Sequence, residues 1–368
     1  MDYFVSDYRV GEPVAGESVV LEDTIMQKGR PAAAGSKILE NFISPFDATV
    51  VSRIEAVGMT ILRKANMDEF GVAGLFPDAV SKGSGAVSAV ADGVAAAALC
   101  NDYSGTIRRQ AAALGLCYIH PTYGTVSRFG LIPAAPSMDQ IGVVCRDPQE
   151  GFRILSVIAG NDLNDGAMLP PSQSQAQPTG KITIGVPANV FAQASDAAAA
   201  AEFAKSFDRV ELELEYFGVF AQVMQILCCA EISSNICRYD GIKFGYRAEG
   251  YRDLRELYTK SRSEALGRDA KLAIVAGAMV LSQGNYENYY DKAMRVRRLI
   301  KQSLEFGKYD AILMPVSGAG PLDGLALNAL PQLCGLPSVT VPIGGGLTLI
   351  AEARREDVLL SALNTAQV

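Results

Sequence analysis

Histidine and tryptophan are nearly missing from this chain of 368 residues, which contains one histidine and no tryptophan. A hydrolytic triad with a histidine base would depend on His120 alone, and we do not expect one. The sequence also has no HExxH run and no cluster of cysteine and histidine, so it gives no sign of a zinc site. We therefore expect neither a metal ion nor a cofactor.

CxxC pairs are missing as well, although the chain has seven cysteines. An odd number of cysteines, most of them in apolar surroundings, is typical of buried thiols in a reducing compartment. We therefore expect a cytoplasmic protein without disulfides. The cysteines are Cys100, Cys117, Cys145, Cys228, Cys229, Cys237 and Cys334.

Positive charge is in the minority, because 33 Lys and Arg residues stand against 40 Asp and Glu, a net charge of −7. This balance argues against direct binding of nucleic acid through general electrostatics. The one basic run, residues 292–301, is interpreted as a helix with a solvated charged face. No apolar run of 18 residues is free of charges or turn signals, and the N-terminus does not resemble a signal peptide, so we expect no membrane association.

Apolar residues, by contrast, make up 49% of the chain, which is ample for a large core. Strand and helix patterns alternate along the sequence, which predicts an α/β fold in a single domain over residues 1–368. The predicted helices are residues 46–57, 86–99, 148–158, 195–207, 217–237, 268–283, 286–305 and 356–366. The predicted strands are residues 59–66, 181–187, 209–217, 310–316, 338–344 and 347–353. Residues 169–180 are predicted to be an exposed loop.

Residues 81–142 are the most informative segment. A loop rich in glycine and serine leads into small residues, and a second Gly/Ser/Thr turn follows at residues 102–106. Because glycine permits close approach of the backbone, such turns bring backbone amides and hydroxyl groups near a ligand. This segment is therefore the predicted functional site.

Several short blocks carry a resemblance to a known family. They include DATVV (47–51), ANMDEFG (65–71), PTYGTVSRFGLI (121–132), SMDQIG (137–142) and GLPSVTVP (335–342). In this order, and over nearly the whole chain, they resemble the amidase signature family and, within it, the A subunits of aminoacyl-tRNA amidotransferases. The resemblance implies a large mixed central sheet flanked by helices on both faces. It also implies amide hydrolysis by a serine nucleophile, a bridging serine and a lysine base, and companion subunits.

The three catalytic positions implied by the resemblance hold other residues here. Thr106 stands at the nucleophile, Lys82 at the bridging serine and Glu22 at the base lysine. Because a threonine carries an extra methyl group, it would crowd a site built for serine. The loop before the nucleophile, which supplies oxyanion-binding amides in the family, corresponds to Tyr103, Ser104 and Gly105.

The resemblance also implies residues that bind the substrate. Arg262 keeps the arginine that holds a carboxylate in the family, whereas the aspartate that holds an amino group falls by count on Leu325, two residues from Asp323. Asp102 and Ser84 complete the predicted binding set, although Ser84 is also interpreted as a helix cap. The implied ligand is a small amide or amino acid.

Two interpretations of the catalytic positions remain open. In the first, Glu22 and Lys82 form an ion pair that fills the old cleft, because a buried lysine alone is costly. The chain would then be an inactive family member that acts as a binding or scaffold protein. In the second, Lys82 is a relocated base beside Thr106 in a threonine-dependent amidase. The first is favoured, because a glutamate partner raises the pKa of a lysine whereas a base needs a lowered one.

Overall fold

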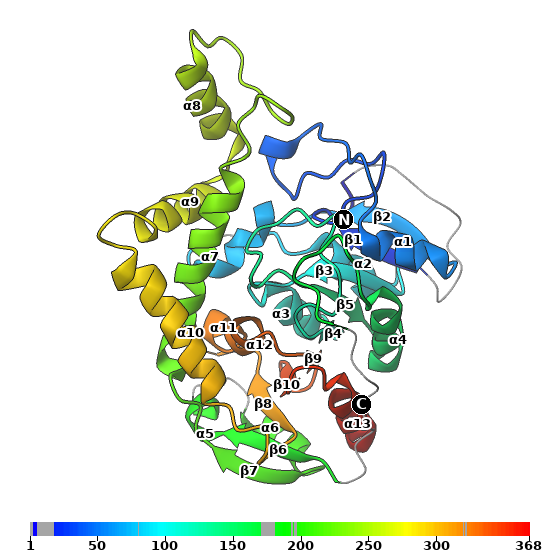
Figure 1. The fold of residues 1–368 in the computed structure, drawn as a ribbon. Coiled ribbons are helices and arrows are strands. Elements are labelled where there is room, and N and C mark those ends of the chain that lie inside the picture. The colour runs from blue at the N-terminus through cyan, green and yellow to red at the C-terminus, as the bar shows by residue number, and fades with distance from the viewer. Residues whose placement is uncertain are drawn as a thin grey trace.

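A mixed sheet of ten strands, counted over the described residues, runs through the middle of the molecule in the computed structural model (Figure 1). The structure describes residues 3–5, 18–79, 81–170, 181–192, 194, 197–318, 320 and 322–368. The strands are β1 (Ser18–Glu22), β2 (Thr60–Ala65), β3 (Ala97–Asn101), β4 (Cys117–His120), β5 (Ile141–Cys145), β6 (Thr183–Pro187), β7 (Asp208–Leu212), β8 (Ala311–Pro315), β9 (Ser338–Val341) and β10 (Leu347–Ala351). Because strands from both halves of the chain join one sheet, the molecule is a single α/β domain, as predicted.

The strand order brings two strand ends together at one edge of the sheet. The order is β2-β1-β3-β5-β4-β9-β10-β8-β6-β7. Strand β1 pairs in parallel with both β2 and β3, whereas β3 and β5 are antiparallel. Since parallel strands place their carboxyl ends on the same side, β1 ends at Glu22 close to the end of β3 at Asn101. The residues that follow these two strands therefore meet.

Helices cover both faces of the sheet, which confirms the predicted architecture (Figure 1). Strand β8 shows the division, because Ile312 and Met314 join one apolar cluster and Ala311 and Leu313 join the other. The first cluster includes α7 (Phe220–Ile236), α9 (Arg268–Val280), α10 (Lys292–Gln302), α11 (Asp323–Ala326) and α12 (Ala329–Cys334). The second includes α1 (Thr49–Ala56), α4 (Pro148–Ile158), α6 (Ala197–Ala204) and α13 (Glu356–Ala366). A third cluster lies under α2 (Gly85–Ala91) and α3 (Thr106–Ala113).

The remaining elements are short or peripheral. Helix α8 (Leu254–Ala265) extends away from the body of the molecule in Figure 1. The others are α5 (Ala188–Phe191), the 3₁₀ turns η1 (Lys37–Leu39), η2 (Glu69–Leu75) and η3 (Phe217–Val219), and the π turn η4 (Glu287–Asp291). Of these, η2 matters for function, because it forms one wall of the cavity described below.

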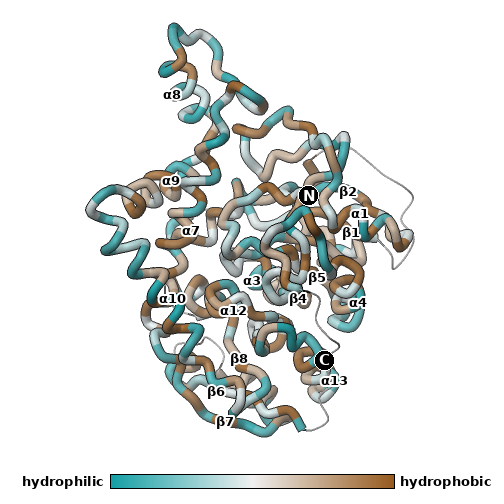
Figure 2. Tube along the Cα trace, viewed as in Figure 1, coloured by the Kyte–Doolittle hydropathy of each residue, from teal (hydrophilic) through white to brown (hydrophobic). Residues whose placement is uncertain are grey.

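Helix α7 is the apolar centre of the first cluster, where it packs against α9 and α10. Residues 217–236 are long and apolar enough to cross a membrane by length and composition alone. However, 56% of the apolar window is buried inside the protein, as in the core helix of a globular domain. Helix α10, which covers α7, is coloured mostly as hydrophilic in Figure 2. The apolar surface of α7 is thus explained by packing against its neighbours.

The predicted helix over residues 86–99 is wrong in its second half. Helix α2 ends at Ala91, Gly93 has a positive φ of 74°, and residues 97–101 form β3. The run of alanines there has helical propensity, but pairing with β1 and β5 on both sides outweighs it.

The other predicted helices and strands agree with the structure to within a few residues at their described ends, although β7 ends at Leu212 rather than at 217. Residues 171–180 of the predicted exposed loop lie outside the described residues, as do Ser195 and Asp196.

Gly277 of α9 marks the closest approach of α9 to α7. A Cβ atom at this position would overlap the backbone carbonyl of Cys229 and lie 2.6 Å from the Cβ of Ser233. Gly277→Ala is therefore expected to lower the free energy of unfolding by about 1–3 kcal/mol, measured by chemical denaturation. Gly218→Ala is the control, because a Cβ there meets open space, and it should leave stability unchanged. Equal stability of the two variants would show that the contact between α7 and α9 relaxes at little cost.

Candidate functional site

A cavity of about 660 Å³ lies where β1 and β3 end and α3 begins. Its lining includes Glu22, Lys82 and Thr106, so the structure brings the three predicted catalytic positions into one cavity. Tyr103, Ser104 and Ser84 from the predicted set also line it. The remaining walls come from η2, the loop that follows it, and Ser317, Leu322 and Leu325.

The turn that leads into α3 is held by Asp102 and Gly105. The Asp102 carboxylate accepts hydrogen bonds from the backbone N–H groups of Ile107 (3.0 Å) and Arg108 (3.4 Å), which satisfies two N–H groups of the first turn of the helix. Gly105 has a φ of 79°, and a Cβ there would overlap the side chain of Asn328. Only glycine therefore fits this position, and the turn presents Thr106 at the start of α3.

The Thr106 hydroxyl lies 3.1 Å from the hydroxyl of Ser104. The methyl group of Thr106 is crowded, because a Cβ at Gly74 of η2 would overlap it. Within the described part of the chain, the backbone N–H groups of Ser104, Gly105 and Thr106 have no hydrogen-bond acceptor. Ser104 and Thr106 line the cavity whereas Gly105 does not, so the amides of Ser104 and Thr106 are the ones available to bind an oxyanion or a carbonyl oxygen.

Glu22, the residue predicted at the base position, is buried at the end of β1. One carboxylate oxygen accepts hydrogen bonds from the Thr24 hydroxyl (2.8 Å) and from the backbone N–H of Asn101 (2.9 Å). Burial raises the pKa of Glu22 to about 7, against the lowering effect of these hydrogen bonds, and the charge of Asp102 raises it further. Near neutral pH this position is thus a half-protonated carboxyl group.

The predicted ion pair between Glu22 and Lys82 is absent, although both residues lie in the part of the chain that the structure describes. The Lys82 side chain is exposed, and its backbone N–H donates to Asp68 (2.7 Å), which fixes the loop rather than the ammonium group. The pairing hypothesis assumed that Lys82 was buried, and it is wrong. The cavity between the two residues is open rather than closed by their side chains.

A different buried ion pair joins Lys64 to Asp23, which lies directly beside Glu22 in the sequence. Lys64 of β2 lies 3.1 Å from the Asp23 carboxylate, and its ammonium group also donates to the backbone carbonyl of Pro31 (2.7 Å). Burial lowers the pKa of Lys64, and the charge of Asp23 opposes that effect. Sequence reasoning missed this pair, because the two residues are 41 positions apart and come together only through the pairing of β1 and β2.

Tyr103 and Ser84 have structural roles beside their places in the cavity wall. The Tyr103 hydroxyl donates to the backbone carbonyl of Phe70 (2.9 Å), which ties the turn to η2. The Ser84 hydroxyl accepts from the backbone N–H of Val87, so Ser84 caps α2 as predicted. The structure therefore favours the capping interpretation of Ser84.

Asp102 and Arg262 do not reach the cavity, which corrects their assignment as residues that bind substrate. Asp102 is fully buried and pairs with Arg108 at 2.8 Å. Arg262 of α8 donates to the backbone carbonyls of Ile236 and Tyr239, so it caps the C-terminal end of α7. Both side chains are thus committed to the fold.

Leu325 and Asp323, the two candidates for the position that holds the ligand's amino group in the family, are placed differently relative to the cavity. Leu325 of α11 lines the cavity, as its count predicted. The carboxylate of Asp323 accepts from the backbone N–H of Gly320 (2.6 Å) and does not line the cavity. Leu325 therefore contributes an apolar side chain to the wall of the cavity at α11.

Sequence reasoning missed two polar residues of the cavity wall, Arg109 and Gln110. The signal was available, because positions three and four residues after Thr106 share its face of α3. Gln110 holds the neighbouring loop, since its side chain accepts from the backbone N–H of Ser84 (2.6 Å) and donates to the Ser84 carbonyl (3.1 Å). The loop that carries Lys82 is thereby fixed against α3.

His120 lies in β4 outside the cavity lining. Burial, and the positive charge of Arg108, hold the pKa of His120 well below its usual range. Its ring nitrogens have no hydrogen-bond partner in the described structure, and the described residues contain no group of three or more His, Cys, Asp or Glu that could hold a metal ion. The single histidine is therefore part of the core beside the site.

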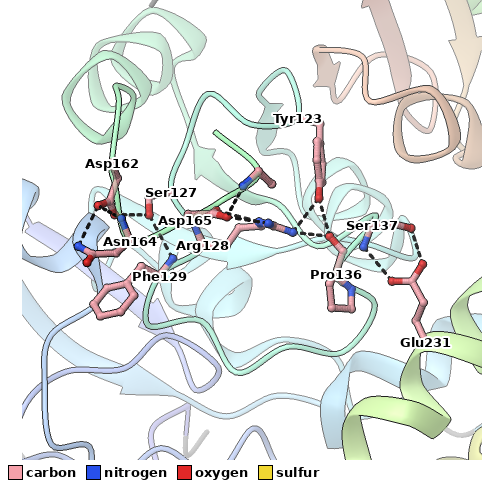
Figure 3. Close-up of polar contacts among 11 residues, drawn as sticks. Tyr123, Ser127, Arg128, Phe129, Pro136, Ser137, Asp162, Asn164, Asp165 and Glu231 are labelled. Carbon is pink, nitrogen blue, oxygen red and sulfur yellow. Dashed lines mark hydrogen bonds and ion pairs between the residues drawn. The ribbon is translucent and has the colours of Figure 1, made fainter. Parts of the chain in front are cut away.

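A polar network fixes the loop between β4 and β5 (Figure 3). Arg128 forms an ion pair with Asp165 at 2.8 Å and donates to the Tyr123 hydroxyl at 2.8 Å. At the far end of the loop, the backbone N–H of Ser137 donates to Glu231 of α7 (2.8 Å). None of these residues lines the cavity. The block at residues 121–132 therefore has a structural role, because it holds the loop between β4 and β5 in place.

Comparisons with known proteins agree with this architecture. The family model described as Amidase matches residues 5–75 and 80–332. The chain is 36% identical to the A subunit of the glutamyl-tRNA(Gln) amidotransferase of Lachnoclostridium phytofermentans, covering 90% of this chain and 76% of the relative. It is 35% identical to the protein of the same name from Wolinella succinogenes, covering 94% of this chain and 87% of the relative.

Solved structures show the same fold. The A subunit of the glutamyl-tRNA(Gln) amidotransferase of Thermotoga maritima superposes with a TM-score of 0.73 at 24% identity, covering 97% of this chain and 85% of that chain. The peptide amidase of Stenotrophomonas maltophilia superposes with a TM-score of 0.76 at 23% identity, covering 95% and 82%. With the family model matched over most of its length and relatives above 30% identity, this chain belongs to the amidase family.

Proposed function

We propose that this protein binds a small amide or amino acid in the cavity at the start of α3 and that its ability to hydrolyse the ligand is impaired. The observation that carries the proposal is the environment of Thr106, whose hydroxyl is within hydrogen-bond distance of only the Ser104 hydroxyl among the described residues. A nucleophile of this kind needs a base within hydrogen-bond reach, and neither Lys82 nor Glu22 makes that contact.

Binding is supported by the groups that the cavity offers. Its volume of about 660 Å³ suits a small molecule. The unpaired amides and the hydroxyl groups of Ser104 and Thr106 can hydrogen-bond to a carboxamide. The protein would therefore retain the binding half of an amidase site without a proton acceptor at the nucleophile.

A threonine-dependent amidase is the second candidate. It is favoured by the open cavity and by Glu22, because a carboxyl group with a pKa of about 7 is suited to proton transfer at neutral pH. Lys82, the base in the sequence-based version of this candidate, has its side chain exposed. Glu22 is the better proton acceptor, but its hydrogen bonds go to Thr24 and Asn101.

We also propose that the protein works with companion subunits in the cytoplasm. The relatives are named as subunits of glutamyl-tRNA(Gln) amidotransferases, which supports partners for this chain. Its net charge of −7 argues against direct contact with nucleic acid by this chain alone. Seven cysteines, all free and six of them buried, suit a reducing compartment.

The proposed function predicts that the purified protein releases no ammonia from glutamine, asparagine or simple amides above the rate of the buffer. Thr106→Ala should behave in the same way, because Thr106 is expected to contribute nothing to hydrolysis. At the same time, at least one small amide should raise the unfolding temperature through binding to the native state. Ammonia release by the wild type that disappears in Thr106→Ala would refute impairment and support the second candidate.

The matched positive control restores the family residues as Glu22→Lys, Lys82→Ser and Thr106→Ser in one chain. Ammonia release by this variant alone would show that the three positions were assigned correctly and that their substitution abolished the activity. Failure of every small amide to stabilise the wild type would contradict the binding half of the proposal.

A further inference from the structure

Arg109 occupies the cavity-facing side of α3. It lies one turn after Thr106, and Gln110 and Ala113 continue the same wall. The Arg109 guanidinium packs directly against Gly324 of α11, where a Cβ atom would overlap it. Arg109 is therefore a cationic group between α3 and α11, at the same cavity as the nucleophile position.

Arg109 has no protein partner among the described residues, in contrast to the neighbouring arginine. Arg108 pairs with Asp102 at 2.8 Å, whereas Arg109 forms neither an ion pair nor a hydrogen bond, and its Nε atom is buried. Arg109 is half-buried, and a buried guanidinium nitrogen without a carboxylate or a carbonyl acceptor is costly. Its fork of N–H groups matches the two oxygens of a carboxylate.

The charge of Asp102 stabilises the Arg109 cation from a distance, but Asp102 is paired with Arg108, and the charges of the cavity wall offer Arg109 no partner. Lys82 adds a second cation at the wall. The Asp68 carboxylate is already occupied, because one oxygen accepts from the backbone N–H of Lys82 and the other from the Ser81 hydroxyl. Burial keeps Glu22 half-protonated near neutral pH. Two cations thus face one occupied carboxylate and one partly neutral carboxyl group, which favours an anionic ligand.

We infer that Arg109 is the residue that binds the carboxylate of a small carboxylate-containing amide, taking the place of Arg262. This inference rests on the proposed function, because it names the ligand class of the same cavity. Arg262 is committed to the end of α7, so the ligand would lie with its carboxylate toward α11. Its amide would then lie toward the free N–H groups at Thr106.

The test compares succinamate, which carries one carboxylate and one carboxamide, with the neutral diamide succinamide. Binding of each to the full chain is measured by isothermal titration calorimetry. The wild type should bind succinamate about tenfold or more tightly than succinamide, because hydrogen bonds to a charged partner are the stronger ones. Arg109→Gln should remove this preference, whereas Arg298→Gln on the exposed side of α10 should keep it.

The outcomes separate the inference from the proposed function. Equal affinity of the wild type for both probes, or an unchanged preference in Arg109→Gln, would overturn the inference and leave the binding function intact. Binding of neither probe at millimolar concentration would overturn the inference, and the proposed function would then be decided by the wider set of small amides described above. Inorganic phosphate that binds more tightly than succinamate in an Arg109-dependent way would overturn the carboxylate assignment.

Arg109→Lys provides a second test if Arg109→Gln does not fold. This variant keeps the positive charge but loses the planar fork, so its affinity for succinamate should fall several-fold while its affinity for succinamide stays the same. An unchanged affinity for succinamate would show that the carboxylate does not lie on the guanidinium group.

Discussion

Asp102→Asn should lower the free energy of unfolding by about 3–5 kcal/mol, because it leaves the fully buried Arg108 without its partner. The carboxylate lies 2.8 Å from the Arg108 Nε and also accepts backbone N–H groups of the first turn of α3. Asparagine has nearly the same shape and can still accept one of those hydrogen bonds, so the loss reports mainly the charge. Chemical denaturation at neutral pH measures it.

The matched control is Glu202→Gln, which makes the same carboxylate-to-amide change in an exposed ion pair with Lys205. Surface pairs contribute little, so stability should barely change. The double variant Asp102→Asn with Arg108→Met should recover part of the loss, because the buried charge is removed as well. If Asp102→Asn costs no more than Glu202→Gln, the buried pair does not stabilise the turn before Thr106.

The general architecture could be predicted because it follows from patterns that are local in sequence. Short runs of mainly apolar residues in segments such as 310–316 and 347–353 predicted strands, and the structure has β8 and β10 there. Residues 97–101 were misassigned, because alanine runs carry no strand signal and the strand exists through its pairing with β1 and β5. Local propensity cannot report such pairing.

The site could be predicted in position but not in its contacts. Counting along the resemblance placed positions 22, 82 and 106 in one cavity, which the structure contains. The polar partners were not predictable in this way, because each depends on residues distant in sequence. Lys64 pairs with Asp23 rather than Lys82 with Glu22, and Arg262 is satisfied by carbonyls at the end of α7. The catalytic roles of the three positions stay predictions.

Glu22 should make the protein less stable as the pH rises from about 4.5 to about 7. Below this window both the native and the unfolded protein carry the proton. Between pH 4.5 and pH 7, Glu22 loses its proton in the unfolded chain but keeps it in the native state. Ionisation therefore stabilises the unfolded state and not the native state, and the free energy of unfolding falls. By pH 7 the loss amounts to about 3 kcal/mol, since each pKa unit corresponds to about 1.4 kcal/mol.

Glu22→Gln removes this titration, because the amide oxygen can still accept from Thr24 and from the backbone of Asn101 while no proton is exchanged. The free energy of unfolding, measured at intervals between pH 4 and pH 8, should therefore decline less in the variant than in the wild type. Some decline should persist, because burial also raises the pKa of Asp139, to about 6. Glu55→Gln at the exposed surface of α1 should follow the wild-type curve. Identical pH profiles for wild type and Glu22→Gln would mean that Glu22 has the same pKa in the native and the unfolded state, so that the cavity holds a full negative charge at Glu22 at neutral pH.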